Sequence, residues 1–143
     1  MSDGRPSVLL AEGNAIYREL LSQQLTRLGC EVIATAHGAE AAAAWRTGSF
    51  ALLITDLQMP HMDGYDLARL IRAEEPAAPL PIVALTAGTS GAELRRCGAV
   101  GMNECIARPV SLSVLRGVID RWCGASVFNP SVVGDLAERA LRR

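Results

Sequence analysis

Short apolar runs alternate along the chain with longer segments in which apolar residues recur every three or four positions. Brief runs rich in Val, Ile, Leu and Ala are typical of buried strands, whereas recurrence at helical spacing is typical of amphipathic helices. The predicted strands are Ser7–Ala11, Glu31–Ala36, Ala51–Thr55, Pro81–Thr86 and Glu104–Ala107. The predicted helices are Ala15–Leu28, Ala39–Thr47, Gly64–Glu74, Ser90–Cys97 and Leu112–Trp122.

The regular alternation of strand and helix predicts a parallel sheet. Parallel strands need a crossover between them, and strands buried on both faces are apolar along their whole length. Because such crossovers are right-handed, the helices cover both faces of the sheet. The sequence therefore predicts a doubly wound α/β fold with five parallel strands. Gly29, Gly48 and Gly98 follow helical patterns and are predicted to end those helices.

Polar or special residues follow four of the five predicted strands. Glu12 and Gly13 come directly after the first strand, and Asp56 follows the third. Thr86 ends the fourth strand, and Arg108 follows the fifth. In a doubly wound sheet, ligands bind at the carboxyl ends of the strands, near the point where the strand order reverses. We therefore expect these residues to converge at one edge of the sheet.

The four side chains suit phosphoryl transfer onto an aspartate. Glu12 and Asp56 could bind a hard divalent cation such as Mg2+, with waters and one backbone carbonyl completing the octahedron. Thr86 offers a hydroxyl donor, and Arg108 offers a fixed positive charge. In such a site the Asp56 carboxylate attacks phosphorus directly, and the surrounding donors and charges hold the phosphoryl oxygens.

Other phosphate chemistries fit the sequence poorly. The segment "EGNAIY" has one glycine where a dinucleotide fingerprint or a Walker loop needs several. A phosphohydrolase with an aspartate nucleophile would typically carry a second acid two residues further on, and that position is Gln58. Gln58 thus argues against a built-in step that hydrolyses the phosphorylated aspartate.

Composition narrows the range of partners. The chain has 143 residues, and its net charge of −1 gives no electrostatic reason to expect nucleic acid or direct membrane contact. No apolar run approaches the roughly 18 residues of a membrane span, which predicts a soluble segment, and the cysteine pattern given below favours a reducing, cytoplasmic location. All 14 basic residues are arginine, so any site that needs a cationic side chain must use a guanidinium.

The four cysteines are widely spaced, which favours free thiols over a disulfide framework or a zinc site.

The segment from Ser7 to Cys123 resembles a response-regulator receiver domain. The resemblance rests on "LLITDLQMPHMDGYDLARLIR", followed in order by "PIVALTA" and "RPVSLSVL". It implies a flavodoxin-like sandwich that acts as a phosphoacceptor and not as a stand-alone enzyme.

The resemblance also implies roles for individual residues. Asp56 is the expected phosphoacceptor, Glu12 is one of an acidic pair, and Gln58 is the donor of a backbone carbonyl to Mg2+. Thr86 is the expected switch hydroxyl, and Arg108 stands at the usual lysine position.

Within receivers, "AEGNAIYREL" and "GAVGMNECIARPVSLSVL" are most similar to the receivers of hybrid sensor kinases of the BvgS-like unorthodox kind. This resemblance implies a phosphorelay between a histidine kinase core and a histidine phosphotransfer domain, as the cytoplasmic part of a membrane-bound kinase. The segment "VFNPSVVGDLAERAL" resembles the linker and opening helix of a phosphotransfer domain. The expected organisation is an extension at 1–6, a receiver at 7–123, and a linker with that first helix at 124–143.

Three residues depart from the receiver pattern. Gly13 replaces the second acid of the pair, which predicts weakened Mg2+ affinity because hard-cation sites are tuned by the charge of their ligands. Arg108 replaces the usual lysine, so a planar, forked guanidinium stands in the place of a compact ammonium group. Cys105 replaces the aromatic residue that often reports the switch. Two hypotheses remain open: a working receiver, and a degenerate pseudo-receiver that binds partners without phosphorylation.

Overall fold

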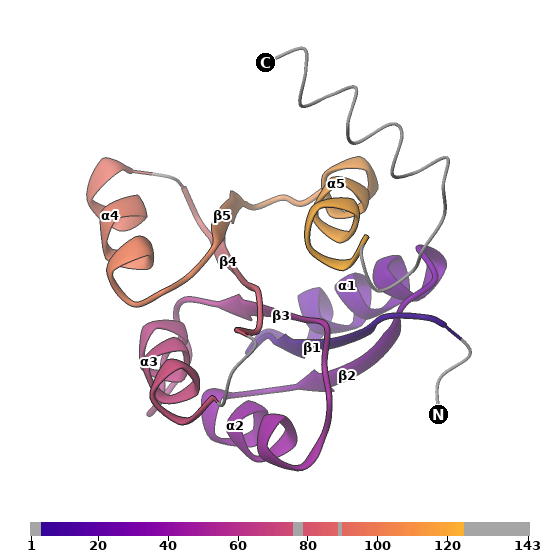
Figure 1. Cartoon of the computed structure of the whole chain (residues 1–143). Coiled ribbons are helices and arrows are strands. Elements are labelled where there is room, and N and C mark those ends of the chain that lie inside the picture. The colour runs from indigo at the N-terminus through magenta and orange to yellow at the C-terminus, as the bar shows by residue number, and fades with distance from the viewer. Residues whose placement is uncertain (1–3, 76–78, 89, 125–143) are drawn as a thin grey trace.

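The computed structural model describes residues 4–75, 79–88 and 90–124. The strands are β1 (Ser7–Ala11), β2 (Glu31–Thr35), β3 (Leu52–Asp56), β4 (Ile82–Thr86) and β5 (Glu104–Ala107). The helices are α1 (Ala15–Arg27), α2 (Gly38–Thr47), α3 (Gly64–Glu74), α4 (Gly91–Ala99) and α5 (Leu112–Cys123). All ten predicted elements are present, with ends that differ from the predicted bounds by at most two residues (Figure 1).

The five strands form one parallel sheet in the order β2-β1-β3-β4-β5. The doubly wound fold is therefore confirmed. The strand order reverses between β1 and β3, where Ala11 lies opposite Thr55. The next residues along these two strands are Glu12 and Asp56, so the two acids leave the sheet side by side at the switch point. The register of β1 and β3 therefore places the Glu12 and Asp56 side chains next to each other.

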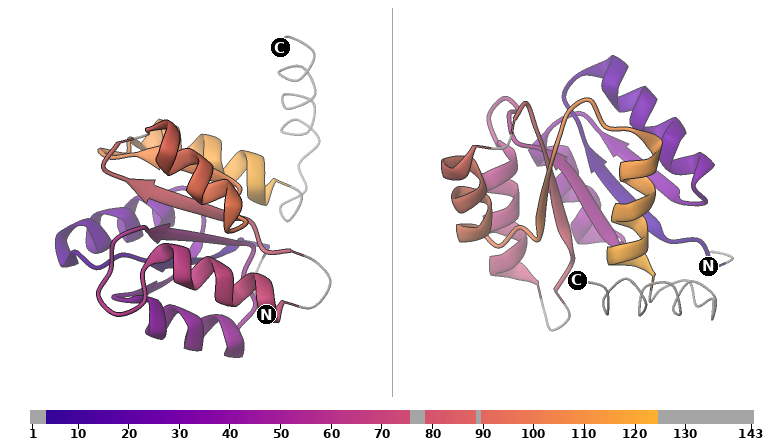
Figure 2. Two further views of the ribbon diagram at one scale, coloured as in Figure 1. Left: turned by 90° about the vertical axis from the view of Figure 1, so that its left-hand side faces the viewer. Right: turned by 90° about the horizontal axis from the view of Figure 1, so that it is seen from above.

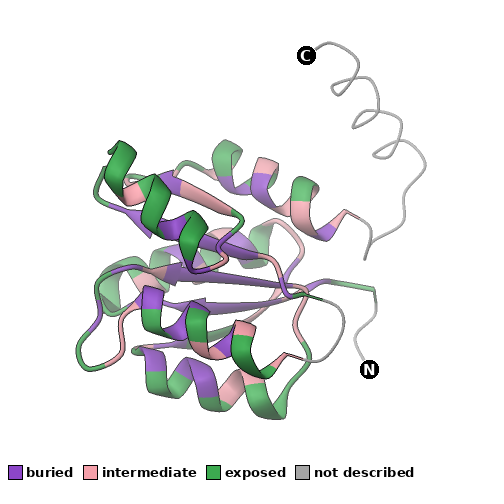
Figure 3. Ribbon diagram, turned by 60° about the vertical axis from the view of Figure 1, so that its left-hand side comes forward, coloured by how far each residue is buried: buried purple, intermediate pink, exposed green. Residues whose placement is uncertain are grey.

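Two apolar layers hold the sheet between its helices. Leu9 and Leu53 belong to the cluster under α2, α3 and α4, whereas Leu10 and Ile54 belong to the cluster under α1 and α5. Figure 2 shows the sheet between these two helical layers, and Figure 3 shows buried strands inside helices whose outer faces are exposed. Because side chains alternate between the two faces of a strand, an unbroken apolar run supplies both layers.

Polar side chains cap the helices that follow the strand tips. Asn14 accepts hydrogen bonds from the backbone N–H groups of Ile16 and Tyr17 at the start of α1. Asp63 and Asp66 form a reciprocal capping box at the start of α3. These caps anchor the turns that carry the polar residues of the strand ends.

The prediction that Gly98 ends a helix is wrong. α4 continues to Ala99, and the chain turns at Gly101, which has φ 89°. The backbone N–H of Met102 then donates to the carbonyl of Cys97. A helix commonly ends on a residue in the left-handed region, where glycine carries no steric cost, and Gly101 meets this requirement three residues later than predicted. Gly29 does end α1 with φ 93°, and Gly48 caps α2.

The predicted linker and helix after Gly124 lie outside the described residues, as do the first three residues of the predicted extension. Among the helices that the structure describes, none is long and apolar enough to cross a membrane.

Candidate functional site

Asp56 ends β3, and the backbone of the β3–α3 loop surrounds it. The Gln58 N–H donates to Asp56 Oδ1 at 3.2 Å, and the Gly64 N–H donates to the carbonyl of Leu57 at 3.0 Å. Burial raises the pKa of the Asp56 carboxyl above its ordinary value, against the opposing effect of hydrogen bonds from the Gln58 and Leu57 backbones. Asp56 is still 15% exposed, so a ligand can reach it.

Glu12 is far more buried, with only 1% of its surface exposed. Its Oε2 accepts the Asn14 N–H at 3.0 Å, and its backbone N–H donates to the carbonyl of Thr35 at 3.0 Å. Arg18 donates to the backbone carbonyl of Glu12 at 3.0 Å, not to its carboxylate. The carboxylate is thus held at the sheet edge with one oxygen directed toward β5.

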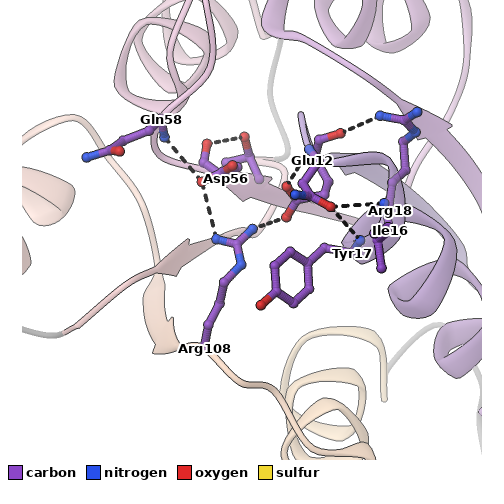
Figure 4. Close-up of polar contacts among 9 residues, drawn as sticks. Glu12, Ile16, Tyr17, Arg18, Asp56, Gln58 and Arg108 are labelled. Atoms are coloured by element: carbon purple, nitrogen blue, oxygen red, sulfur yellow. Dashed lines mark hydrogen bonds and ion pairs between the residues drawn. The ribbon is translucent and has the colours of Figure 1, made fainter.

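Arg108 lies between the two acids (Figure 4). Its Nη2 forms an ion pair with Glu12 Oε1, and its Nη1 is 3.4 Å from Asp56 Oδ1. The guanidinium carbon lies 5.2 Å from the centroid of the Tyr17 ring, and the backbone N–H of Arg108 donates to the carbonyl of Thr86 at 2.8 Å. Burial lowers the pKa of Arg108, but an arginine in a protein stays protonated. The Arg108–Pro109 peptide bond is cis.

A cavity of about 180 Å³ opens beside Asp56. Gln58, Thr86, Glu93 and Arg108 line it together with Asp56. The hydroxyl of Thr86 donates to the carbonyl of Gly88 at 2.8 Å. The predicted acceptor, the predicted hydroxyl and the predicted cationic side chain therefore share one cavity, while Glu12 joins them through Arg108.

Gly13 leaves room for a side chain. A Cβ atom at this position would lie 3.6 Å from the carbonyl oxygen of Ala36 and 3.9 Å from Cγ of Met59, which are ordinary contacts. The missing second acid is thus a feature of the sequence and not a consequence of crowding.

As the residues lie, the two carboxylates of the site are paired with a guanidinium and are not arranged around the position of a divalent cation. No group of three or more acidic, histidine or cysteine side chains in the described ranges could hold a metal ion. The two carboxylates that converge, Glu12 and Asp56, both face the same guanidinium. A Mg2+ ion that used both would have to displace Arg108, which is a requirement that the sequence did not reveal.

Sequence reasoning missed three residues of the site: Tyr17 and Arg18 beside the acids, and Glu93 in the cavity. Tyr17 and Arg18 lie in the first turn of α1, shortly after Glu12 in the sequence. This closeness along the chain could have indicated that they belong to the site. Glu93 lies in the first turn of α4, and no spacing in the chain connects it to Asp56.

Cys105 has a neighbour that the wide cysteine spacing did not reveal. Its Sγ lies 2.8 Å from Sγ of Cys97, and both are free thiols. Burial is the main effect that raises the pKa of Cys105, to about 12, so the thiol is neutral at physiological pH.

Comparison with known proteins agrees with this geometry. Residues 8–120 match the model of the response regulator receiver domain. The chain belongs to the receiver domain family. A similar curated relative is the virulence sensor protein BvgS of Bordetella pertussis, 41% identical over 115 residues that make up 76% of this chain and 9% of that protein. The resemblance to the receivers of sensor kinases is thereby confirmed, and this chain spans about a tenth of the length of such curated relatives.

Solved receivers superpose closely on this one. The receiver domain of a Pseudomonas aeruginosa sensor histidine kinase, with magnesium coordinated in its active site cleft, is 31% identical with a TM-score of 0.77, over 84% of this chain and 98% of that one. The receiver of a Saccharomyces cerevisiae response regulator, crystallised with a histidine phosphotransfer signaling protein, is 30% identical with a TM-score of 0.81, over 87% of this chain and 92% of that one. Receiver domains generally bind Mg2+.

Proposed function

We propose that this receiver is a phosphoacceptor in a phosphorelay. Asp56 takes a phosphoryl group from a phosphohistidine on a histidine kinase core and passes it to a histidine phosphotransfer domain. The observation that carries the proposal is the cavity in which Asp56, Thr86 and Arg108 meet at the carboxyl ends of β3, β4 and β5. A nucleophile, a hydroxyl donor and a cation around one cavity suit an in-line displacement at phosphorus.

The transfer needs no general base. A carboxylate oxygen of Asp56 forms the new bond to phosphorus, and the P–N bond of the phosphohistidine breaks. The electron pair of that bond stays with the ring, which leaves as neutral imidazole when its other nitrogen carries a proton. Arg108 and the Thr86 hydroxyl hold the phosphoryl oxygens, for which the hydroxyl must turn away from the Gly88 carbonyl. Gln58 supplies no acid–base group for hydrolysis, which suits a residue that passes the phosphoryl group onward.

The rest of the protein is part of this proposal. The matched sensor proteins are much longer than this chain, which suits a receiver at 7–123 within a hybrid histidine kinase. The segment 124–143 would link it to the phosphotransfer domain and begin the first helix of that domain. We place this part of the kinase in the cytoplasm, with no nucleic acid and no direct membrane contact among its partners.

We expect Mg2+ to bind more weakly here than in a receiver with a complete acidic pair. Gly13 removes one carboxylate ligand, and Arg108 contacts the other two. The residues left to such an ion are Glu12, Asp56 and the backbone carbonyl of Gln58. Fewer charged ligands and a competing cation both lower affinity.

The test is to treat the chain with acetyl phosphate, and separately with beryllofluoride, at millimolar Mg2+. We expect intact-mass spectrometry to show one phosphoryl group, and fluorine NMR to show bound beryllofluoride. Both signals should vanish in Asp56→Asn, which keeps the shape of the side chain without the nucleophile. A native sample that is folded by circular dichroism but gives neither signal would contradict the proposal.

A second candidate is a pseudo-receiver that binds partners through its α/β surface without phosphorylation. The ion pairs of Arg108 with both acids favour it, because they occupy the groups that a working site would use. The discriminating variant is Gly13→Asp with Arg108→Lys, which restores the receiver pattern. Phosphorylation in the double variant alone would support the pseudo-receiver, and equal phosphorylation of the native chain would exclude it.

A further inference from the structure

The guanidinium of Arg108 lies where the two carboxylates of the site converge. One Nη contacts Glu12, and the other lies 3.4 Å from Asp56 (Figure 4). A guanidinium carries its donors in a rigid planar fork, which allows one side chain to face two acids at once. A lysine ammonium is a compact point charge without this fork.

Glu12 would otherwise be a buried and uncompensated charge. A buried carboxylate is stable only when it is paired with a cation or bound to a metal. Here Arg108 neutralises Oε1, and the Asn14 N–H satisfies Oε2 at 3.0 Å. Glu12 is therefore satisfied by protein groups alone, and the pairing needs no ion from solution.

Arg108 is held in this position from several sides. Its backbone N–H donates to Thr86, its guanidinium lies over the ring of Tyr17, and its side chain is only 18% exposed. Groups that are already oriented when charge develops stabilise a transition state without the cost of reorganisation. Arg108 is thus a preorganised cation beside the reacting carboxylate.

Arg108 is the cation that both strand-tip acids contact. With glycine at position 13, Glu12 and Asp56 are the two acids that face its guanidinium, and its charge compensates one of them. Arginine can also bind two phosphoryl oxygens in parallel, in the same geometry that it uses for carboxylates.

We propose that Arg108 takes the place of the divalent cation in this receiver, so that Asp56 accepts a phosphoryl group without Mg2+. This inference rests on the proposed phosphoacceptor function and names the group that supplies its positive charge. With acetyl phosphate, an Asp56 oxygen forms the bond to phosphorus, and the bond from phosphorus to the acetyl oxygen breaks. Acetate leaves with that electron pair, no proton moves, and Arg108 remains protonated while its fork holds the phosphoryl oxygens.

The test compares phosphorylation in buffer stripped of metals on a chelating resin with phosphorylation in millimolar MgCl2. The readouts are the rate of phosphoryl addition from acetyl phosphate by intact mass, and beryllofluoride binding by fluorine NMR. For the native chain we expect rates within a few-fold of each other in the two buffers. For Gly13→Asp with Arg108→Lys we expect the metal-free rate to fall at least about tenfold below the rate with Mg2+.

Three variants assign the effect to Arg108. Arg108→Gln should lose most metal-free phosphorylation and beryllofluoride binding, while Arg116→Gln removes an exposed arginine on α5 and should match the native chain. Arg108→Lys keeps the positive charge but lacks the forked guanidinium, and it replaces Arg108→Gln in the test if that variant does not fold. Its rate of metal-free phosphorylation should also fall below that of the native chain.

The outcomes separate this inference from the proposed function. Modification of the native chain only in the presence of Mg2+ would overturn the inference and leave the phosphoacceptor function standing. A folded native chain that is modified in neither buffer would overturn both. Native-like metal-free rates in Arg108→Gln, or in Arg108→Lys, would show that the fork of Arg108 is not the cation responsible.

Discussion

The side of the site that holds Asp56, here called the acceptor side, is built differently from the side that holds Glu12 and Arg108, here called the cation side. The β3–α3 loop holds Asp56 through its backbone: the Gln58 N–H binds the carboxylate, and Gly64 approaches the strand end too closely for any side chain. The turns after β1 and β5 instead meet through side chains, where Arg108 pairs with Glu12 and with Asp56. Gly13, in the first of these turns, has room for a Cβ atom, whose nearest neighbours would lie at ordinary contact distances.

This difference explains which parts of the receiver pattern persist in this chain. A position fixed by backbone packing accepts almost no other residue, so the sequence around Asp56 keeps the family pattern. Positions whose role is charge can be exchanged more readily, because Coulomb interactions tolerate changes in shape better than close packing does. Both exchanges lie on this side of the site: Gly13 removes a negative charge, and Arg108 keeps a positive charge in a different shape.

The largest expected effect is on the acceptor side, from Gly64→Ala. Its Cβ would collide with the carbonyl oxygen of Asp56 and lie 3.0 Å from Cα of Leu57, both backbone atoms that cannot move aside cheaply. We expect a loss of about 2–3 kcal/mol in the free energy of unfolding, measured with urea.

The matched control is Gly98→Ala, at an exposed position of α4 where a new Cβ meets nothing within 4 Å. It should stabilise the domain by about 0.5–1 kcal/mol, because alanine favours a helix over glycine. Equal stability of the two variants would contradict the idea that backbone packing fixes the acceptor loop.

The next effect concerns the cation side, in a double-mutant cycle of Glu12→Gln and Arg108→Gln. Arg108→Gln leaves the buried Glu12 carboxylate without its cation, and Glu12→Gln leaves Arg108 with Asp56 but without its more buried partner. We expect a coupling energy of about 1–2 kcal/mol from urea unfolding, little changed by added salt.

The reference pair for that cycle is Arg46 with Glu74, which are 49% and 42% exposed and 2.7 Å apart. Exposed pairs are screened by solvent, so their coupling should be weaker and should decline with salt. If the Glu12–Arg108 pair behaved in the same way, its side chains would not form the buried unit described above.

Restoring an acid at position 13 tests the role of charge on the cation side. A Cβ atom at position 13 makes ordinary contacts with Ala36 and Met59, and Gly13→Asp adds a third carboxylate there. We expect Mg2+ affinity to rise about tenfold in a calorimetric titration, since ligand charge sets the affinity for hard cations. Gly13→Asn has the same size without the charge and should bind Mg2+ as the native chain does; equal gains in both variants would show that charge is not the cause.

The smallest effect is the pH dependence of Asp56→Asn. Because burial raises the pKa of Asp56 above its usual 3.8, ionising this carboxyl costs more in the folded state than in the unfolded state. That cost is fully present above the raised pKa and is absent below the unfolded value. The variant should therefore be slightly more stable than the native chain at neutral pH, and this advantage should shrink as the pH falls toward 4. An advantage that is constant with pH would contradict a raised pKa.

Much of the fold could be predicted from the sequence, because it depends on local patterns. The unbroken apolar run from Leu52 to Ile54 is typical of a strand covered on both faces, and Gly29 marks the end of α1. The failure at Gly98 has a physical reason. Several glycines near a helix end look alike in sequence, and the turn geometry selects the one that must adopt positive φ.

The sequence by itself determined the sheet, its order of elements, the acids at the strand tips, and the exchanges at Gly13 and Arg108. It did so because apolar periodicity and turn residues act over short distances along the chain. Only the tertiary structure decided that Arg108 reaches across to Glu12, 96 residues earlier, and lies between it and Asp56. That pairing depends on the registers that join β1 to β5 through β3 and β4, and on the depth at which Glu12 is buried, and both arise only when the strands assemble.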